Sequence, residues 1–141
     1  MYATWTATTW AKVGLDIVHM QAVRGKHYLV VARDDFSGWV EARALGKADS
    51  KRVAGFIWED IVCRHGIFSR LIVDGGPENK GLVEGLMQVL DIRWVVVSAY
   101  HPQANGMIER GHKPIVDALA KMTDGGEGDW VLCLPAVLLA D

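Results

Sequence analysis

The stretch "KVGLDIVHMQAVRGKHYLVVARDDFSGWVEARAL", residues 12–45, decides the fold. In its first segment apolar and other residues alternate, so Val13 and Leu15 fall on one face of an extended chain and Asp16 on the other. Turn formers in "AVRGK" and "DFSG" divide the stretch into three strand-like segments. Three strands joined by short turns predict an antiparallel meander. Asp16 is then a carboxylate in the middle of an apolar strand.

The hydrophobic period changes after this meander. Apolar residues recur every four positions from Val53 to Ile61, after an N-cap at Asp49 or Ser50. The segment ends at "RHG", residues 64–66, where a basic residue and a glycine are typical of a helix C-terminus. The pattern predicts a helix with one buried stripe.

Strands and helices alternate along the rest of the chain. We expect, in order, a strand in "IFSRLIVD" (67–74), a helix over about 79–90, a strand in "IRWVVVS" (92–98), a helix over about 105–122 and a last helix over about 128–140. The order is βββαβαβ followed by helices. With its crossover connections, it predicts an α/β fold with a mixed sheet flanked by helices. Pro114 should kink the third helix, because proline lacks the N–H that a helix interior needs.

Composition narrows the class of protein. The 141 residues fit one domain, and 50% of them are hydrophobic, so the chain can bury a substantial core. The formal charge of −2 gives no overall basic surface for nucleic acid, so any such binding must be local, metal-assisted or helped by further domains. Cys63 and Cys133 lack metal-ligand spacing and are expected to be buried thiols. No secretory signal, membrane-spanning run or repeat is present, and the apolar, uncapped end in "VLLAD" suggests a fragment of a longer polypeptide.

Three carboxylates are candidates for one metal site. Asp74 ends a strand that a crossover should set parallel to the strand of Asp16. Glu109 lies about 100° from the centre of the apolar stripe on the third helix, where that helix leaves the core. Such oxygen ligands suit Mg²⁺ or Mn²⁺, which would offset the repulsion between the carboxylates. With 17 acidic residues in the chain, spacing alone leaves solvated or ion-paired roles open, and Glu78 is a rival ligand.

Two sequence blocks resemble a known family. "VDGGPENKG" (73–81) and "AYHPQANGMIER" (99–110) look like the catalytic core of retroviral and long-terminal-repeat retrotransposon integrases, most like the Ty3/gypsy branch, with its D,D-35-E signature. The resemblance runs from about Trp10 to the end. It implies an RNase H-like fold and one integrase catalytic core over residues 1–141, with the zinc-binding N-terminal domain and the C-terminal domain absent.

The resemblance also implies the catalytic site. Asp16, Asp74 and Glu109 would form the metal-binding triad, with 34 residues between positions 74 and 109 where the family usually has 35. Two Mg²⁺ (or Mn²⁺) ions per active site would be bridged by Asp16, with Asp74 and Glu109 each completing one site. Water would attack phosphorus in line during 3′-end processing, and a DNA 3′-hydroxyl would do so during strand transfer. Gly75 departs from the family, where asparagine is common.

Polar residues near Glu109 are expected to contact DNA. His101, Gln103 and Asn105 lie in a turn-rich loop that the resemblance places at the end of the element DNA. Lys113, four residues after Glu109, lies on nearly the same side of the helix and could contact a phosphate. Turn formation, N-capping by Asn105 and simple solvation of Lys113 stay open as alternatives.

Expected partners follow from the resemblance. The DNA partners are double-stranded element ends and double-stranded target DNA. The protein partners are a second copy of the chain in a homodimer and further copies in a higher oligomer of the full-length protein. No membrane partner is expected. The site of action would be the nucleus after a cytoplasmic stage, although this fragment carries no targeting signal. Segments 50–64 and 128–140 should form the dimer, because they carry excess apolar residues: Phe56, Ile57, Trp58, Ile61, Trp130, Leu132, Leu134 and Leu138. An RNase H-like nuclease that only hydrolyses, and a non-enzymatic, domesticated or inactive dimerising core, remain alternatives.

Overall fold

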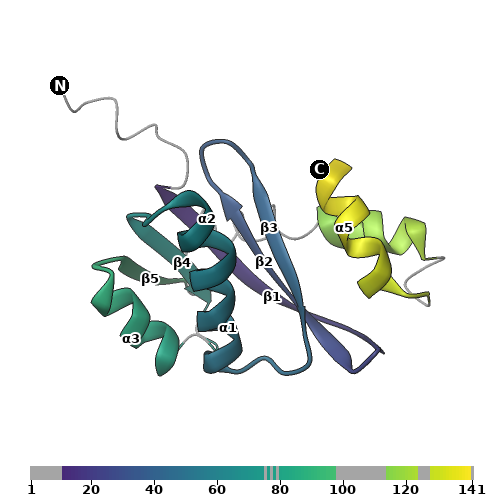
Figure 1. Ribbon diagram of the computed structural model, residues 1–141, viewed down its shortest axis with the longest axis horizontal. Helices are drawn as coiled ribbons and strands as arrows, with labels where there is room; N and C mark the ends of the chain where they lie inside the picture. The colour runs from purple at the N-terminus through teal and green to yellow at the C-terminus, as the bar shows by residue number, and fades with distance from the viewer. Residues whose placement is uncertain are drawn as a thin grey trace.

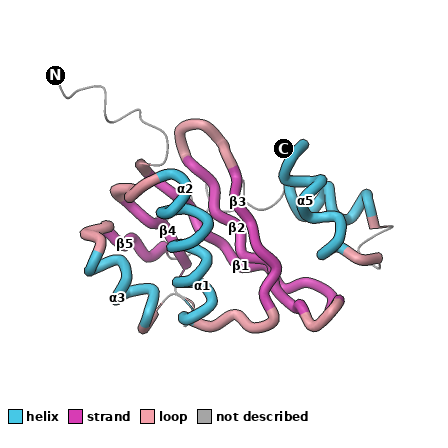
Figure 2. Tube along the Cα trace, viewed as in Figure 1, coloured by secondary structure: helices cyan, strands magenta, loops and turns pink. Residues whose placement is uncertain are grey.

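The computed structural model describes residues 11–74, 76, 78, 80–97, 114–123 and 128–140. Within this part of the chain, five strands form one mixed sheet in the order β3-β2-β1-β4-β5, with helices on both faces (Figure 1, Figure 2). The first three strands pair antiparallel, and the last two run parallel to β1. The strands are β1 (Lys12–Val23), β2 (Lys26–Asp34), β3 (Val40–Leu45), β4 (Arg70–Asp74) and β5 (Arg93–Val97).

The antiparallel meander predicted for residues 12–45 is confirmed. β1 pairs with β2, with Asp16 opposite Val31, and β2 pairs in turn with β3. Arg24 (φ 53°) and Gly25 (φ 75°) make the two-residue turn between β1 and β2. Two successive positive φ angles give the hairpin turn whose twist matches that of the flanking strands.

The first helical segment begins and ends where the sequence predicts. α1 (Ser50–Phe56) follows Asp49, whose side chain accepts a hydrogen bond from the backbone N–H of Arg52 at 2.9 Å. α2 (Cys63–His65) ends at Gly66, whose φ of 93° suits glycine better than any other residue. Asp49 rather than Ser50 is therefore the N-cap.

The middle of this segment differs from the expected α-helix. η2 (Ile57–Val62) is a π-helical stretch between α1 and α2. An apolar repeat of four residues is longer than the α-helical turn of about 3.6 residues, so a widened turn keeps the repeat on one face. Val53, Ile57 and Ile61 are accordingly all fully buried.

The later elements agree with prediction to within a few residues. α3 (Leu82–Val89) precedes β5, and α5 (Trp130–Ala140) is the last helix. Residues 114–122 are helical. The earlier part of the predicted 105–122 helix lies outside the described residues, so the kink at Pro114 stays a prediction. In the parts of the chain that the structure places, no helix is both long and apolar enough to cross a membrane.

Two hydrophobic clusters occupy the two faces of the sheet. The first lies between the sheet and α1, η2 and α3, and it includes Val13 and Leu15 of β1. The second lies between the sheet and the helical residues 114–122 together with α5. These two helices lie together, apart from α1, α2 and α3, in Figure 1. Because side chains alternate along a strand, Asp16 lies on the face of the second cluster. That cluster contains Leu29, Val31, Val40, Ile115, Leu119, Trp130, Leu134 and Val137.

Two expectations about apolar surface are corrected. Cys63 is exposed and Cys133 is partly buried, so the prediction of buried thiols is wrong, because apolar sequence neighbours do not fix which side of a helix a residue occupies. The dimer prediction also counted residues that the chain uses for its own core. Trp58 and Leu132 are exposed and Leu138 is partly buried, whereas the cores take Phe56, Ile57, Ile61, Trp130 and Leu134.

Candidate active site

Asp16 and Asp74 lie on neighbouring parallel strands. The last pair of the β1–β4 ladder is Gly14 with Ile72, and each aspartate is two residues further along its strand. Adjacent strands are about 4.8 Å apart, and residues two apart on a strand share a face. Both carboxylates therefore belong to the same face and the same level of the sheet, at the edge where β4 ends.

Backbone N–H groups orient the two carboxylates. The Oδ1 of Asp16, which is partly buried, accepts a hydrogen bond from the N–H of Ile17 at 2.9 Å. The Oδ1 of Asp74, which is exposed, accepts one from the N–H of Gly76 at 3.0 Å. The second bond links a carboxylate to the backbone two residues on, which is the geometry of an Asx turn.

Gly76 lies against the end of the Glu78 side chain. A Cβ atom at this position would collide with the Glu78 carboxyl group, whose Oε2 would be 2.7 Å away. Glu78, the rival ligand, thus folds back against the glycine that donates to Asp74. A substitution at Gly76 would therefore have to move the flexible Glu78 side chain.

The acids fit a hard divalent cation. Two carboxylates at one level of neighbouring strands repel each other unless positive charge lies between them, and Mg²⁺ and Mn²⁺ prefer oxygen ligands. No group of three or more His, Cys, Asp and Glu side chains that could hold a metal ion occurs among the residues that the structure describes. Glu109, the third predicted ligand, lies outside those residues, as do the predicted DNA contacts His101, Gln103, Asn105 and Lys113.

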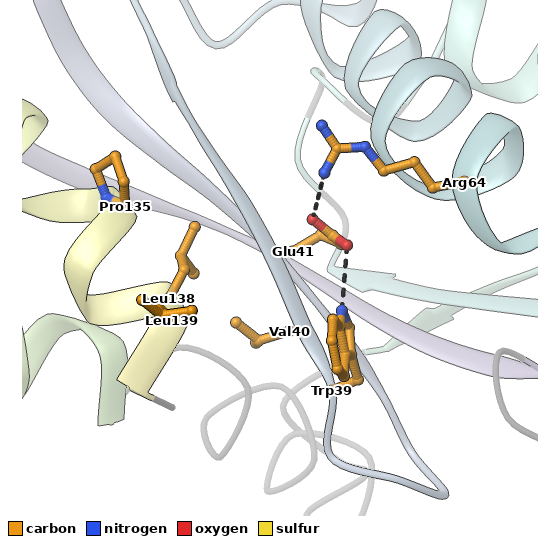
Figure 3. A pocket seen from close by; sticks show the side chains of 7 residues that line it. All are labelled: Trp39, Val40, Glu41, Arg64, Pro135, Leu138 and Leu139. Carbon is orange, nitrogen blue, oxygen red and sulfur yellow. Dashed lines mark hydrogen bonds and ion pairs between the residues drawn. The ribbon is translucent and has the colours of Figure 1, made fainter.

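A pocket of about 360 Å³ lies elsewhere, between β3, α2 and α5 (Figure 3). Glu41, only 9% exposed, is its polar centre. Its carboxylate accepts hydrogen bonds from Nε1 of Trp39 at 3.1 Å and Nη1 of Arg64 at 3.2 Å, and its Oε2 lies 2.8 Å from Nε2 of His65. Sequence reasoning missed this cluster. The alternation in β3 signals only that Trp39 and Glu41 share a face, and nothing local connects them to α2.

Comparison with curated proteins finds retroviral polyproteins. The chain is 35% identical over 127 residues to the Gag-Pol polyprotein of avian reticuloendotheliosis virus, 40% identical over 116 residues to that of feline leukemia virus and 40% identical over 117 residues to that of koala retrovirus. The alignments cover 89%, 81% and 82% of the chain, but only 11%, 7% and 7% of the polyproteins. No family model matches the chain.

Solved structures show the same architecture. The catalytic core domain of BIV integrase superposes with a TM-score of 0.73 and 25% identity over 93% of this chain and 82% of that one. A chain of the simian T-cell lymphotropic virus intasome, in complex with PP2A regulatory subunit B56 gamma, gives a TM-score of 0.80 at 21% identity, over 95% and 49% of the two chains.

Fold and relatives together define the class. The mixed five-stranded sheet with flanking helices is an RNase H-like fold, which confirms the expected fold class. Its sequence relatives and structural neighbours support the polynucleotidyl transferase family. Within that class, the chain belongs with the retroviral integrase catalytic cores, an integrase type of enzyme. Assignment to the Ty3/gypsy branch stays a prediction.

Proposed function

We propose that this chain is a metal-dependent polynucleotidyl transferase that trims the 3′ ends of retroelement DNA and joins them to target DNA. The observation that carries the proposal is the placement of Asp16 and Asp74 at one level of two adjacent parallel strands. The Gag-Pol relatives and the integrase core structure support it. The chain spans a small part of those polyproteins, and we take residues 1–141 as one catalytic core domain.

Asp16 and Asp74, with Glu109, are proposed to hold two Mg²⁺ (or Mn²⁺) ions per active site. Such ions, when bound, supply positive charge that activates an attacking hydroxyl and stabilises the departing oxygen. The chain's own part is to fix the ligands. Hydrogen bonds from Ile17 and Gly76 orient the two aspartates before substrate arrives, so little reorganisation is needed during reaction.

DNA is the proposed substrate, and His101, Gln103, Asn105 and Lys113 are its proposed contacts. The support is the sequence block that carries them, which leads into Glu109 in the order that integrases share. One structural neighbour is a chain of an intasome, and this likeness supports a multimeric complex with double-stranded DNA. We place the action in the nucleus, after a cytoplasmic stage.

A homodimer of this core is also proposed, with a higher oligomer in the full-length protein. Trp58 of η2 is 45% exposed, and Leu132 and Leu139 of α5 are 68% and 89% exposed. Large apolar side chains at this exposure are typical of a surface that another protein covers. A second copy of the chain fits, because both helices belong to the segments that the family resemblance assigns to pairing.

The test compares wild type with Asp74→Asn, using Asp91→Asn as the matched control. Asp91 lies in the turn before β5, away from the acids, and its φ of 57° suits asparagine equally well. Calorimetric titration with Mg²⁺ and Mn²⁺ should show binding to wild type and control and its loss in Asp74→Asn. Strand transfer on labelled duplex ends should fall by about a hundredfold or more, because a group that stabilises charge in the transition state is removed.

Each other outcome selects an alternative. Metal binding that survives in Asp74→Asn contradicts the proposed site. Metal-dependent cleavage without joining favours an RNase H-like nuclease. A wild type that binds no metal and joins no DNA ends favours a non-enzymatic dimerising core.

A further inference from the structure

Three basic side chains from three strands stand in lateral register. Lys12 of β1 pairs with Arg70 of β4, and Arg70 pairs with Arg93 of β5. Adjacent strands are about 4.8 Å apart, so the three Cα positions span roughly 10 Å across the sheet. We call Lys12, Arg70 and Arg93 the basic row.

The basic row lies on the same face of the sheet as the aspartates. The residue after each member packs into the first core cluster, which lies on the opposite face. Lys12 is four residues before Asp16, and Arg70 is four residues before Asp74. Because both intervals are an even number of residues, the two residues of each pair lie on the same face of the sheet, about 13 Å apart along the strand. The packed residues that follow the row are Val13, Leu71 and Trp94.

The basic row places like charges side by side on adjacent strands with little compensation from ion pairs. Like charges opposite each other on neighbouring strands destabilise a sheet. Among the described residues, the positive charge of Lys12 has one ion-pair partner, Asp35, at 3.8 Å and with both side chains about two-fifths exposed. Arg70 and Arg93 are exposed, and neither forms an ion pair with any residue that the structure describes. By contrast, ion pairs engage Arg24, Arg43, Arg52 and Arg64.

Between the row and the acids, β1 and β4 carry no charged residue, although Arg33 of β2 pairs with Gly14 at this level. Gly14 and Ile72 occupy the intermediate positions of β1 and β4, and both are buried. The face therefore separates a cationic level from an acidic level instead of pairing them. About four base pairs of B-DNA, at roughly 3.4 Å each, cover the same 13 Å interval.

We propose that the basic row binds the phosphate backbone of duplex DNA. Guanidinium groups suit phosphate because their N–H donors match its oxygens in pairs. Contacts of this kind fix the register of a duplex without reading its sequence, so the row would position the DNA whose phosphodiester reaches the aspartates. This inference rests on the proposed function. It also accounts for local DNA binding by a chain whose net charge is −2.

The test is DNA binding by the double variant Arg70→Gln/Arg93→Gln. The matched control, Lys47→Gln/Lys51→Gln, removes the same two charges around the start of α1. Fluorescence anisotropy with a short labelled duplex, in EDTA and over a series of salt concentrations, measures both. The row variant should bind about tenfold more weakly or worse, and its slope of log K against log salt should shrink by about two, since each lost phosphate contact removes about 0.9. The control should keep the wild-type slope.

A melting curve separates this role from a structural one. Removing like charges from adjacent strands should leave Tm unchanged or raise it. If the double variant does not melt cooperatively, Arg93→Gln alone, on the edge strand β5, should lose about half as much of the slope. An unchanged slope, an equal loss in the control, or no binding by wild type overturns the proposal, as does tighter binding of a glutamate-rich peptide than of DNA.

The experiment in EDTA is independent of metal. If the row variant loses DNA binding while Asp74→Asn keeps full metal binding, the basic row stands and the catalytic proposal fails. If Asp74→Asn loses metal binding while the row variant binds DNA like wild type, the catalytic proposal stands and the basic row fails.

Discussion

Glu41 shows how one residue joins three parts of the molecule. It lies on the edge strand β3, yet its carboxylate is bonded to Trp39 of the preceding turn and to Arg64 of α2 (Figure 3). It also contacts His65 of α2. A carboxylate with so little exposure needs such partners, because an unpaired buried charge is costly. The bonds tie the end of the helical segment to the sheet edge. They hold that edge in place, while Asp16 lies two strands away and Asp74 three.

We expect Glu41→Gln to lower the free energy of unfolding by about 1–3 kcal/mol, because a neutral amide replaces the buried carboxylate that Arg64 and His65 contact. Urea denaturation at neutral pH measures the change. Glu59→Gln is the matched control, since its carboxylate also pairs with an arginine, Arg43, but is 60% exposed. An exposed pair contributes less than about 1 kcal/mol. Equal losses in the two variants would show that burial of the Glu41 carboxylate does not matter.

At the scale of elements, Asp49 fixes where the first helical segment starts. Its carboxylate accepts the N–H of Arg52 and also contacts the Arg52 guanidinium. The backbone hydrogen bond from Arg52 is the main cause that lowers the pKa of Asp49, and the positive charges of Arg52 and Lys47 add to it. A lowered folded-state pKa stabilises the protein above the unfolded pKa, and that contribution is lost as pH falls through the folded value.

Asp49→Ala should therefore lower Tm by about 2–4 °C at neutral pH, as the loss of a helix cap does. The difference from wild type should shrink as the pH falls below the ordinary aspartate pKa of about 4 and on through the lowered pKa of folded Asp49. Asp49→Asn keeps a side-chain acceptor for the N-cap and should lose less at neutral pH. Calorimetric melting at several pH values tests this. A difference from wild type that stays constant down to strongly acidic pH would speak against a charged cap.

Strands and helix ends could be predicted because their signals are local. Alternation in residues 12–20 and the cap at Asp49 depend only on neighbours in sequence. The π-helical turn of η2 could not, because a repeat of four apolar residues fits an α-helix nearly as well until the sheet beneath it is known. The placement of Asp16 and Asp74 on adjacent strands follows from the crossover, although their catalytic role stays a prediction.

Features that depend on strand register could not be predicted from the sequence. Lys12, Arg70 and Arg93 are ordinary surface cations when read along the chain. Only the pairing of β1, β4 and β5 aligns them. The Glu41 cluster is similar, since its partners lie 23 and 24 residues away. A shift of one residue in any strand would send the same side chains to the opposite face.

At the scale of the whole molecule, the apolar side chains proposed for the dimer lie away from the aspartates. Trp58 lies on η2, and Leu132 and Leu139 lie on α5. Leu139 and Trp39 both line the pocket of Figure 3. Covering these side chains would bury the open side of β3. The acids, at the end of β4, would stay accessible to DNA. A dimer formed in this way leaves both active sites open.

Sedimentation of wild type, Trp58→Glu and Leu139→Glu tests this arrangement, with Val89→Glu as control. Val89 is 83% exposed on α3, so it presents an apolar side chain outside the proposed dimer surface. Wild type and control should be dimeric at roughly tens of micromolar. Each of the other two variants should weaken association by about thirtyfold or more, because charge in a buried interface core costs about 2 kcal/mol or more. If wild type remains monomeric, or if Val89→Glu dissociates as readily as Leu139→Glu, pairing does not use η2 and α5. Metal binding by Asp74 should be unchanged in all three variants, since none of the substituted residues lies on the strands that carry the acids.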